Sequence, residues 1–277
     1  MNKILKLLTA LSLCFIMICV AGCGQKDSSS SESEKLHRLI AQYEEWVLVR
    51  SPELAAYLGD DSRAGELDDY SAAGIEKNHL HRVGELKKLG GVDRSVLPEK
   101  DKFLYDLYKK HLDIRIDGMK FKDYLRPINQ RPDSLHLLLM KLSTFSVFTT
   151  EKNYRDFLSQ LSHIPRLLDE TMEKMKLGLK ENITYPKAAL HAVAGQLASM
   201  LVDDPSRTTL YEPFKKIPAN IPAETGKELQ EKALNIIGEK VIPAFRKFHK
   251  YWTDEYYPNC AETLGLADLP NGEAWYN

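Results

Sequence analysis

The chain has 277 residues, of which 43% are hydrophobic, and its 38 basic and 39 acidic side chains give a net charge of −1. This length suffices for one large domain or two small ones with a sizeable core. The near-neutral balance, with both signs interspersed, argues against the basic surface that nucleic-acid binding requires, so we expect no nucleic-acid partner.

The first 22 residues have the pattern of an export signal. Two lysines are followed by an almost wholly apolar run from Leu7 to Val20, which is shorter than the ~20 residues that a membrane span needs. The next residues complete Val20-Ala21-Gly22-Cys23, which resembles a bacterial lipobox, whose cysteine is lipidated and becomes the first residue of the mature protein. We therefore predict a lipoprotein signal peptide over 1–22 and lipid attachment at Cys23. The alternative is an ordinary signal peptide or an N-terminal anchor.

A serine-rich polar segment follows the cysteine. Residues 24–34 contain no apolar side chain and four consecutive serines, which predicts a flexible tether over 23–34 and a folded domain over 35–277. Beyond the signal and Cys23, only Cys260 remains as a thiol, so no intramolecular disulfide is expected. We expect Cys260 to be a partly buried packing residue; a nucleophile is the alternative.

From residue 35 onward, the apolar residues recur every three or four positions, as they do on one face of a helix. Ser51-Pro52-Glu53 has the pattern of a helix start, and Gly59 is expected to end that short helix. Further helices are predicted over 71–89 and about 98–115, and residues 124–130 are expected to be extended or turning because of Pro127.

Two longer apolar stripes continue through a proline. One extends from Tyr154 to Leu179 through Pro165, and the other from Ile237 to Trp252 through Pro243. An unbroken stripe on both sides of a proline favours one long kinked helix over two separate helices. Between them, Pro186 is expected to open another helix. The predicted fold class is all-α, a bundle of long, partly kinked helices.

The sequence contains no motif for metal binding or catalysis. The eight histidines include no H-E-x-x-H pattern, and His79 and His81 would point to nearly opposite sides of a helix. The acidic pairs, such as Asp203-Asp204, are neighbours in sequence and do not converge as acid–base catalysis requires. No nucleophile elbow, phosphate loop or dinucleotide motif occurs. We therefore assign no catalytic residue and no metal ligand.

Aromatic residues gather near the end of the sequence. They are Trp252, Tyr256, Tyr257, Trp275 and Tyr276. Core packing explains such large rings. The alternative is a substrate-binding wall, for which Trp275 and Tyr276 are the candidate residues.

Five segments together resemble the bacterial domain of unknown function 885 family, whose members are often lipoproteins. They are SPELAAYLG from Ser51, YLRPINQ from Tyr124, Ile164-Pro165 followed by Met175 and Gly178-Leu179, VIPAF from Val241 leading to EYYP, and LPNGEAWY from Leu269. The resemblance extends from about residue 34 to the last residue. Each motif is weak alone, and their common order makes the match specific.

That family resembles helical zinc metallopeptidases of the gluzincin type. The resemblance implies a metal segment with His-Glu and then Pro-Gly-His, well C-terminal of the segment that matches Gly272–Tyr276 here. None of its zinc ligands can be transferred to a residue of this sequence. We therefore expect the N-terminal half of the family fold, from a truncated, split or frameshifted relative; a complete protein with its own role is the alternative.

These observations predict an exported lipoprotein, anchored to the cell membrane or outer envelope, that resembles the N-terminal part of a zinc metallopeptidase and is inactive alone. No cofactor is expected in this chain, although zinc is expected in the full-length family. A separate C-terminal half or a peptide would be its partner besides the membrane. The alternative is a non-enzymatic helical lipoprotein that binds peptides or proteins. Hydrolysis by carboxylates or Cys260 is a third, less favoured, possibility.

Overall fold

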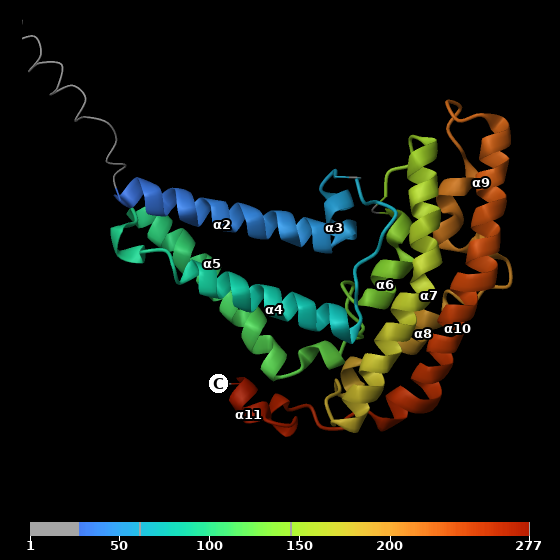
Figure 1. Cartoon of the computed structure of the whole chain (residues 1–277). Coiled ribbons are helices and arrows are strands. Elements are labelled where there is room, and N and C mark those ends of the chain that lie inside the picture. Colours follow the sequence, from blue (N-terminus) through green and yellow to red (C-terminus); the bar gives the residue numbers. More distant parts are fainter. Residues whose placement is uncertain (1–27, 61, 145, 277) are drawn as a thin grey trace, which may run out of the picture.

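The computed structural model describes residues 28–60, 62–144 and 146–276, and its first part is an arm of three long helices. The arm consists of α2 (Ser28–Arg50), α4 (Ala72–Leu89) and α5 (Glu99–Lys120), with α3 (Pro52–Tyr57) after α2. The arm has its own small core, which contains Leu36, Tyr43, Leu89, Val92, Leu97, Tyr108 and Leu112. Figure 1 shows the arm projecting sideways from the rest of the molecule.

The predicted flexible tether is too long, because α2 already begins at Ser28. The side chain of Glu32 accepts a hydrogen bond of 2.7 Å from the backbone N–H of Asp93. Lys35 also donates to the carbonyl of Gly91, so the first turns of α2 are held against the corner between α4 and α5. Helix extension adds one hydrogen bond per residue once a nucleus exists, and serine opposes it only weakly.

The second part is a tall helical wall beside the arm. It pairs α7 (Glu151–Lys180) with α9 (Ala223–Ile236) and α10 (Ile242–Tyr251). The predicted continuity through both prolines is confirmed, because α7 is unbroken at Pro165 and the helical path continues from α9 through Pro243. A π-helical turn over Ile237–Val241 precedes Pro243, and a second one covers Trp252–Tyr256. Such wider turns rearrange the backbone hydrogen bonds where a proline lacks its N–H.

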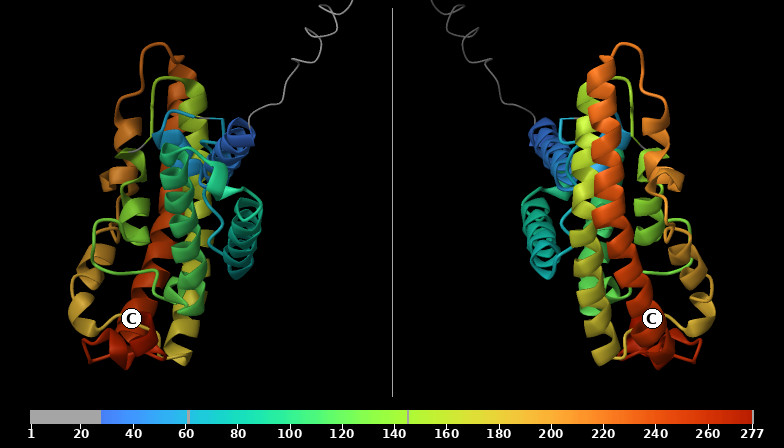
Figure 2. Two further views of the ribbon diagram at one scale, coloured as in Figure 1. Left: turned by 90° about the vertical axis from the view of Figure 1, so that its left-hand side faces the viewer. Right: turned by 90° about the vertical axis from the view of Figure 1, so that its right-hand side faces the viewer.

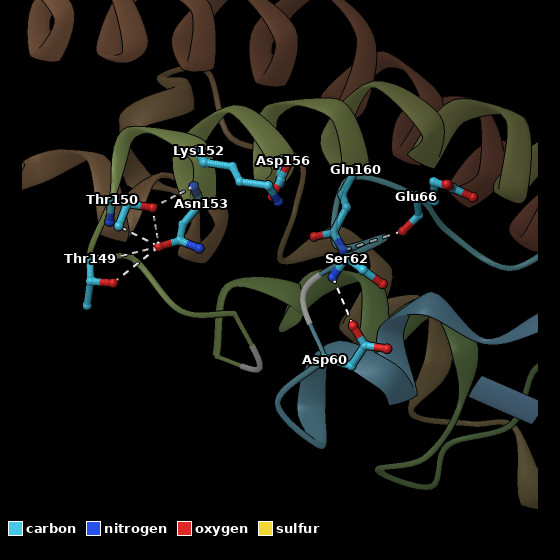
Figure 3. A network of polar contacts seen from close by, with 9 residues as sticks. All are labelled: Asp60, Ser62, Glu66, Thr149, Thr150, Lys152, Asn153, Asp156 and Gln160. Atoms are coloured by element: carbon cyan, nitrogen blue, oxygen red, sulfur yellow. Dashed lines mark hydrogen bonds and ion pairs between the residues drawn. The ribbon is translucent and has the colours of Figure 1, made fainter. Parts of the chain in front are cut away.

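The start of α7 is fixed by a reciprocal cap. The backbone N–H of Asn153 donates to the side chain of Thr150, and the Asn153 side chain accepts from the backbone N–H of Thr150 at 3.0 Å. Figure 3 shows this cap beside the Lys152–Asp156 ion pair of 2.6 Å on the next turn. The cap satisfies N–H groups that a helix end otherwise leaves without partners.

Shorter helices complete the fold. They are α6 (Leu135–Met140), α8 (Val193–Ala198) and α11 (Gly272–Tyr276), with short 3₁₀ turns between them, including one at Thr209–Lys215. The helix expected from Pro186 is broken into a 3₁₀ turn at Lys187–Ala189 and then α8. Figure 2 shows α8 and the Thr209–Lys215 turn on the side of the wall opposite the arm.

The all-α prediction is confirmed for the part of the chain that the structure describes. Within it, the only β-type pairing is an isolated bridge between Pro186 and Ala261. In that same part, none of the helices combines the length and the hydrophobicity needed to cross a bilayer.

Candidate functional site

The candidate site is a cavity of about 350 Å³ between α3, α6 and α7, which we call the leucine hollow. Its apolar lining consists of Leu54, Leu135, Leu138, Leu139 and Leu142. Leu135, Leu139 and Leu142 are buried, whereas Leu54 and Leu138 are exposed to solvent. The volume is at the small end of the range for ligand pockets, so the hollow suits one apolar side chain or a small ligand.

A few polar residues also line the hollow, and two of them are already engaged within the protein. Ser146 donates from its hydroxyl to the carbonyl of Leu142 at 3.1 Å. Gln160 of α7 contacts the carbonyl of Glu66 at 3.4 Å, as Figure 3 shows, and so ties the loop after α3 to the wall. These contacts build the walls of the hollow.

Glu53, in the first turn of α3, has one carboxyl oxygen without a hydrogen-bond partner in the described structure. Its Oε1 accepts a hydrogen bond of 2.9 Å from the backbone N–H of Asp68, whereas its Oε2 is buried and has no hydrogen-bond partner in the described structure. Burial raises the pKa of Glu53 above its usual value. A buried polar atom without a partner is costly, so a hydrogen-bond donor delivered by a ligand would be stabilised there.

A charged network lies behind Glu53 and joins the arm to the wall. Arg50 donates to the carboxylate of Asp68 at 2.9 Å. The ammonium of Lys174, on α7, lies 5.0 Å from the centre of the Tyr70 ring, and Tyr70 also lines the leucine hollow. Burial lowers the pKa of Lys174 to about 8, although nearby carboxylates oppose this shift. The network fixes the loop that carries Asp68 and Tyr70 between α2 and α7.

Trp275, which the sequence suggested as a substrate-binding residue, lies at the far end of α5. Its ring stacks on Phe121 with a centroid distance of 5.2 Å and an angle of 6° between the planes. The guanidinium of Arg126 covers the ring at 4.5 Å. These contacts hold α11 against the end of the arm, away from the leucine hollow (Figure 1). The side chain of Tyr276 and the whole of Cys23 lie outside the described residues.

Cys260 is buried, which confirms its expected packing role. Its thiol donates to the carbonyl of Tyr256 at 3.3 Å. Burial raises the pKa of the Cys260 thiol to about 12, so the reactive thiolate is disfavoured.

The described histidines do not fit a zinc centre. His136 is fully buried, and its two ring nitrogens contact Ser134 at 3.0 Å and Gln196 at 2.9 Å. His81 stacks on Trp46 with a centroid distance of 4.0 Å. Among residues 28–60, 62–144 and 146–276, no group of three or more histidine, cysteine or carboxylate side chains is placed to hold a metal ion.

Sequence reasoning missed the role that Glu53 can play. The helix start at Ser51-Pro52-Glu53 is confirmed, since α3 begins at Pro52 with Glu53 in its first turn. The sequence pattern that could have indicated this role is an acidic residue near two leucines, Leu54 and Leu58, which are both exposed. What the sequence could not reveal is that Asp68, fifteen residues later, occupies one carboxyl oxygen and leaves the other without a partner.

Comparisons with known proteins agree with this architecture. The model of a family described as "Bacterial protein of unknown function (DUF885)" matches residues 52–277. A solved structure described as "the putative lipoprotein from Colwellia psychrerythraea" is similar, with a TM-score of 0.69 and 14% sequence identity. The match covers 88% of this chain and 45% of that one, so the chain spans less than half of that protein's length. No curated protein matches the sequence.

Proposed function

Because the chain belongs to the bacterial DUF885 family of proteins of unknown function, we propose that it is an exported, lipid-anchored protein that binds peptides in the leucine hollow. Two features support the anchor. The apolar leader ends with Val20-Ala21-Gly22-Cys23. The fold is similar to that of the Colwellia psychrerythraea protein, which is described as a putative lipoprotein. Export and attachment of lipid at Cys23 would hold the helical domain at the cell envelope.

The observation that carries the binding proposal is the buried Oε2 of Glu53 beside a leucine-lined cavity. A peptide offers both groups that such a site needs. An apolar side chain such as leucine or phenylalanine fills the hollow, and a nearby N–H or terminal ammonium donates to Glu53. Leu138, at the exposed mouth, would contact the bound side chain.

Peptides are the ligand class that the resemblance to helical zinc metallopeptidases supports. Zinc would polarise the scissile carbonyl or activate water in such enzymes. We propose that this chain supplies binding and that hydrolysis depends on a zinc-bearing segment outside the described residues, such as a separate C-terminal half. The part assigned to Glu53 and the leucines is to bind and orient the peptide. A lipoprotein that binds peptides without any enzyme partner is the alternative.

Calorimetric titration with short peptides tests the proposal. A pentapeptide that begins with leucine should bind, and the same peptide beginning with aspartate should bind at least tenfold more weakly. In Glu53→Gln, the backbone N–H of Asp68 keeps the amide oxygen as its acceptor, so the NH₂ group lies where Oε2 was. This change should weaken peptide binding about tenfold, or ~1.4 kcal/mol. Leu138→Ala should have a similar effect, since it removes apolar contact area.

Two matched variants control for nonspecific effects. Glu45→Gln makes the same charge change at an exposed position of α2, and Leu80→Ala truncates an exposed leucine of α4. Both should bind the peptide as the unmodified chain does. Equal affinity for the leucine and aspartate peptides, or full binding by Glu53→Gln, would contradict the proposal.

A further inference from the structure

Helix α5 carries apolar residues on two opposite faces. One face packs into the arm through Tyr108 and Leu112. Phe103, Leu107 and Ile114 form a second stripe, because residues four and seven positions apart share a helix face. Their exposed fractions are 70%, 56% and 57%, and we call them the outer stripe. Exposed apolar residues gathered in this way mark an interaction surface.

The outer stripe begins at the end of the arm where the described chain begins. His37 of α2 contacts Asp101 of α5 at 3.0 Å, and Phe103 follows two residues later. The Glu32–Asp93 hydrogen bond holds the preceding turn of α2 to the same corner. Figure 1 shows α2 and α5 starting at this common end, remote from α9.

The length of the intervening chain limits how far this end can lie from a lipid on Cys23. Only five residue steps separate Cys23 from Ser28, the first residue of α2. A fully extended chain spans at most ~3.3–3.6 Å per residue, so these five steps span at most about 18 Å. A lipid at Cys23 therefore keeps the start of the outer stripe close to the bilayer surface.

We propose that the outer stripe of α5 lies on the membrane surface, with Phe103 and Leu107 in the lipid headgroup region. The inference rests on the proposed lipid anchor and goes beyond it, because it assigns an orientation to the domain. Lys100 and Lys110 flank the stripe and are exposed. Their ammonium groups suit lipid phosphates, as on helices that lie in a membrane interface.

Site-specific fluorescence quenching tests this orientation. The full lipidated chain is reconstituted in phosphatidylcholine–phosphatidylglycerol vesicles that contain a spin-labelled phosphatidylcholine. An environment-sensitive dye is attached to Phe103→Cys or, as a control, to Lys227→Cys, both in a Cys260→Ala background. The control suits the comparison because the Lys227 side chain is 69% exposed and belongs to α9. We expect at least threefold more quenching at position 103 than at position 227.

Mass spectrometry of Cys23 separates the two proposals. Lipid on Cys23 with equal quenching at both positions would overturn the orientation and leave the anchor intact. An unmodified Cys23 would overturn both the anchor and the orientation. Protection of the dye at position 103 without vesicles, in a chain that sediments as a dimer, would show that a second copy covers the stripe and would also overturn the inference. Leu107→Glu should reduce the quenching at position 103.

Discussion

The guanidinium of Arg50, the last residue of α2, donates a hydrogen bond of 2.9 Å to the carboxylate of Asp68. Asp68 is buried, and its burial raises the pKa of that carboxyl even though Arg50 lowers it. The neighbouring N–H of Asp68 binds Glu53. One ion pair therefore connects the arm to the loop that completes the leucine hollow.

Removing the cation should destabilise the protein. Arg50→Met leaves a buried carboxylate without its partner, and we expect a loss of about 2–4 kcal/mol in the free energy of unfolding. Urea unfolding at pH 7.5 measures this loss. The double variant Arg50→Met/Asp68→Asn removes both charges and should recover at least half of the stability. A single variant as stable as the unmodified chain would show that Asp68 does not depend on Arg50.

His136 should make stability depend on pH. Burial lowers its pKa to about 4, and an unfolded histidine has a pKa of about 6.5. Between these values the unfolded chain binds a proton that the folded chain does not, so stability falls as the pH decreases through this window. The contribution of His136 between pH 7.5 and pH 5.0 is about 2 kcal/mol.

Urea unfolding at these two pH values isolates that contribution. His136→Gln should be less stable at pH 7.5, because it disturbs a buried hydrogen-bonded site, and should lose about 2 kcal/mol less on acidification. The exposed His191 provides the control, and His191→Gln should keep the full pH dependence. An unchanged pH dependence in His136→Gln would contradict the assignment.

Lys174 should limit stability at neutral pH. Its pKa falls to about 8 in the folded chain, so the unfolded chain binds the additional proton between pH 8 and about pH 10.5. Below this window the buried charge costs stability, and the cost disappears as the pH rises through it. Methionine resembles the neutral form of the lysine side chain. Lys174→Met should therefore raise the free energy of unfolding by about 1–3 kcal/mol at pH 7 and leave it unchanged near pH 10.5. Thermal unfolding at both pH values measures the difference.

The fold could be predicted largely because local patterns determine it. The apolar stripes on both sides of Pro165 and Pro243 predicted two long helices, and the structure has both. The helix predicted over 71–89 is also present, and the side chain of Ser71 caps its start by accepting a hydrogen bond from the backbone N–H of Gly74. The helix after Pro186 was misjudged because an apolar pattern of period 3.6 does not distinguish a continuous helix from short helical turns.

The candidate site could not be predicted because it depends on contacts distant in sequence. Glu53, Leu138 and Gln160 meet in the leucine hollow although they belong to three separate elements. The unpartnered oxygen of Glu53 is a property of that assembly. Trp275, unlike Glu53, could be named as a candidate from its residue type alone. The structure adds that Phe121 and Arg126 enclose its ring.

Replacing Cys23 should release the protein from membranes. Cys23→Ser removes the thiol that would carry the lipid, and the remaining leader has fewer apolar residues than a stable span needs. Fractionation of bacterial cells should find the unmodified chain in membranes and Cys23→Ser in soluble or mislocalised form. Cys260→Ser is the matched control, because that thiol is buried, and should remain with membranes. Unchanged membrane association of Cys23→Ser would contradict lipid attachment.

The purified chain should bind no stoichiometric zinc and cleave no peptide. A catalytic zinc needs about three protein ligands and one open position for water. His136 has both ring nitrogens in hydrogen-bond contacts, and His37 contacts Asp101 at 3.0 Å on the arm. Elemental analysis after dialysis against 10 equivalents of zinc, with a peptide-cleavage assay before and after chelation, measures both properties. About one zinc per chain together with chelator-sensitive cleavage would contradict this prediction. It would show that this sequence forms a complete peptidase by itself.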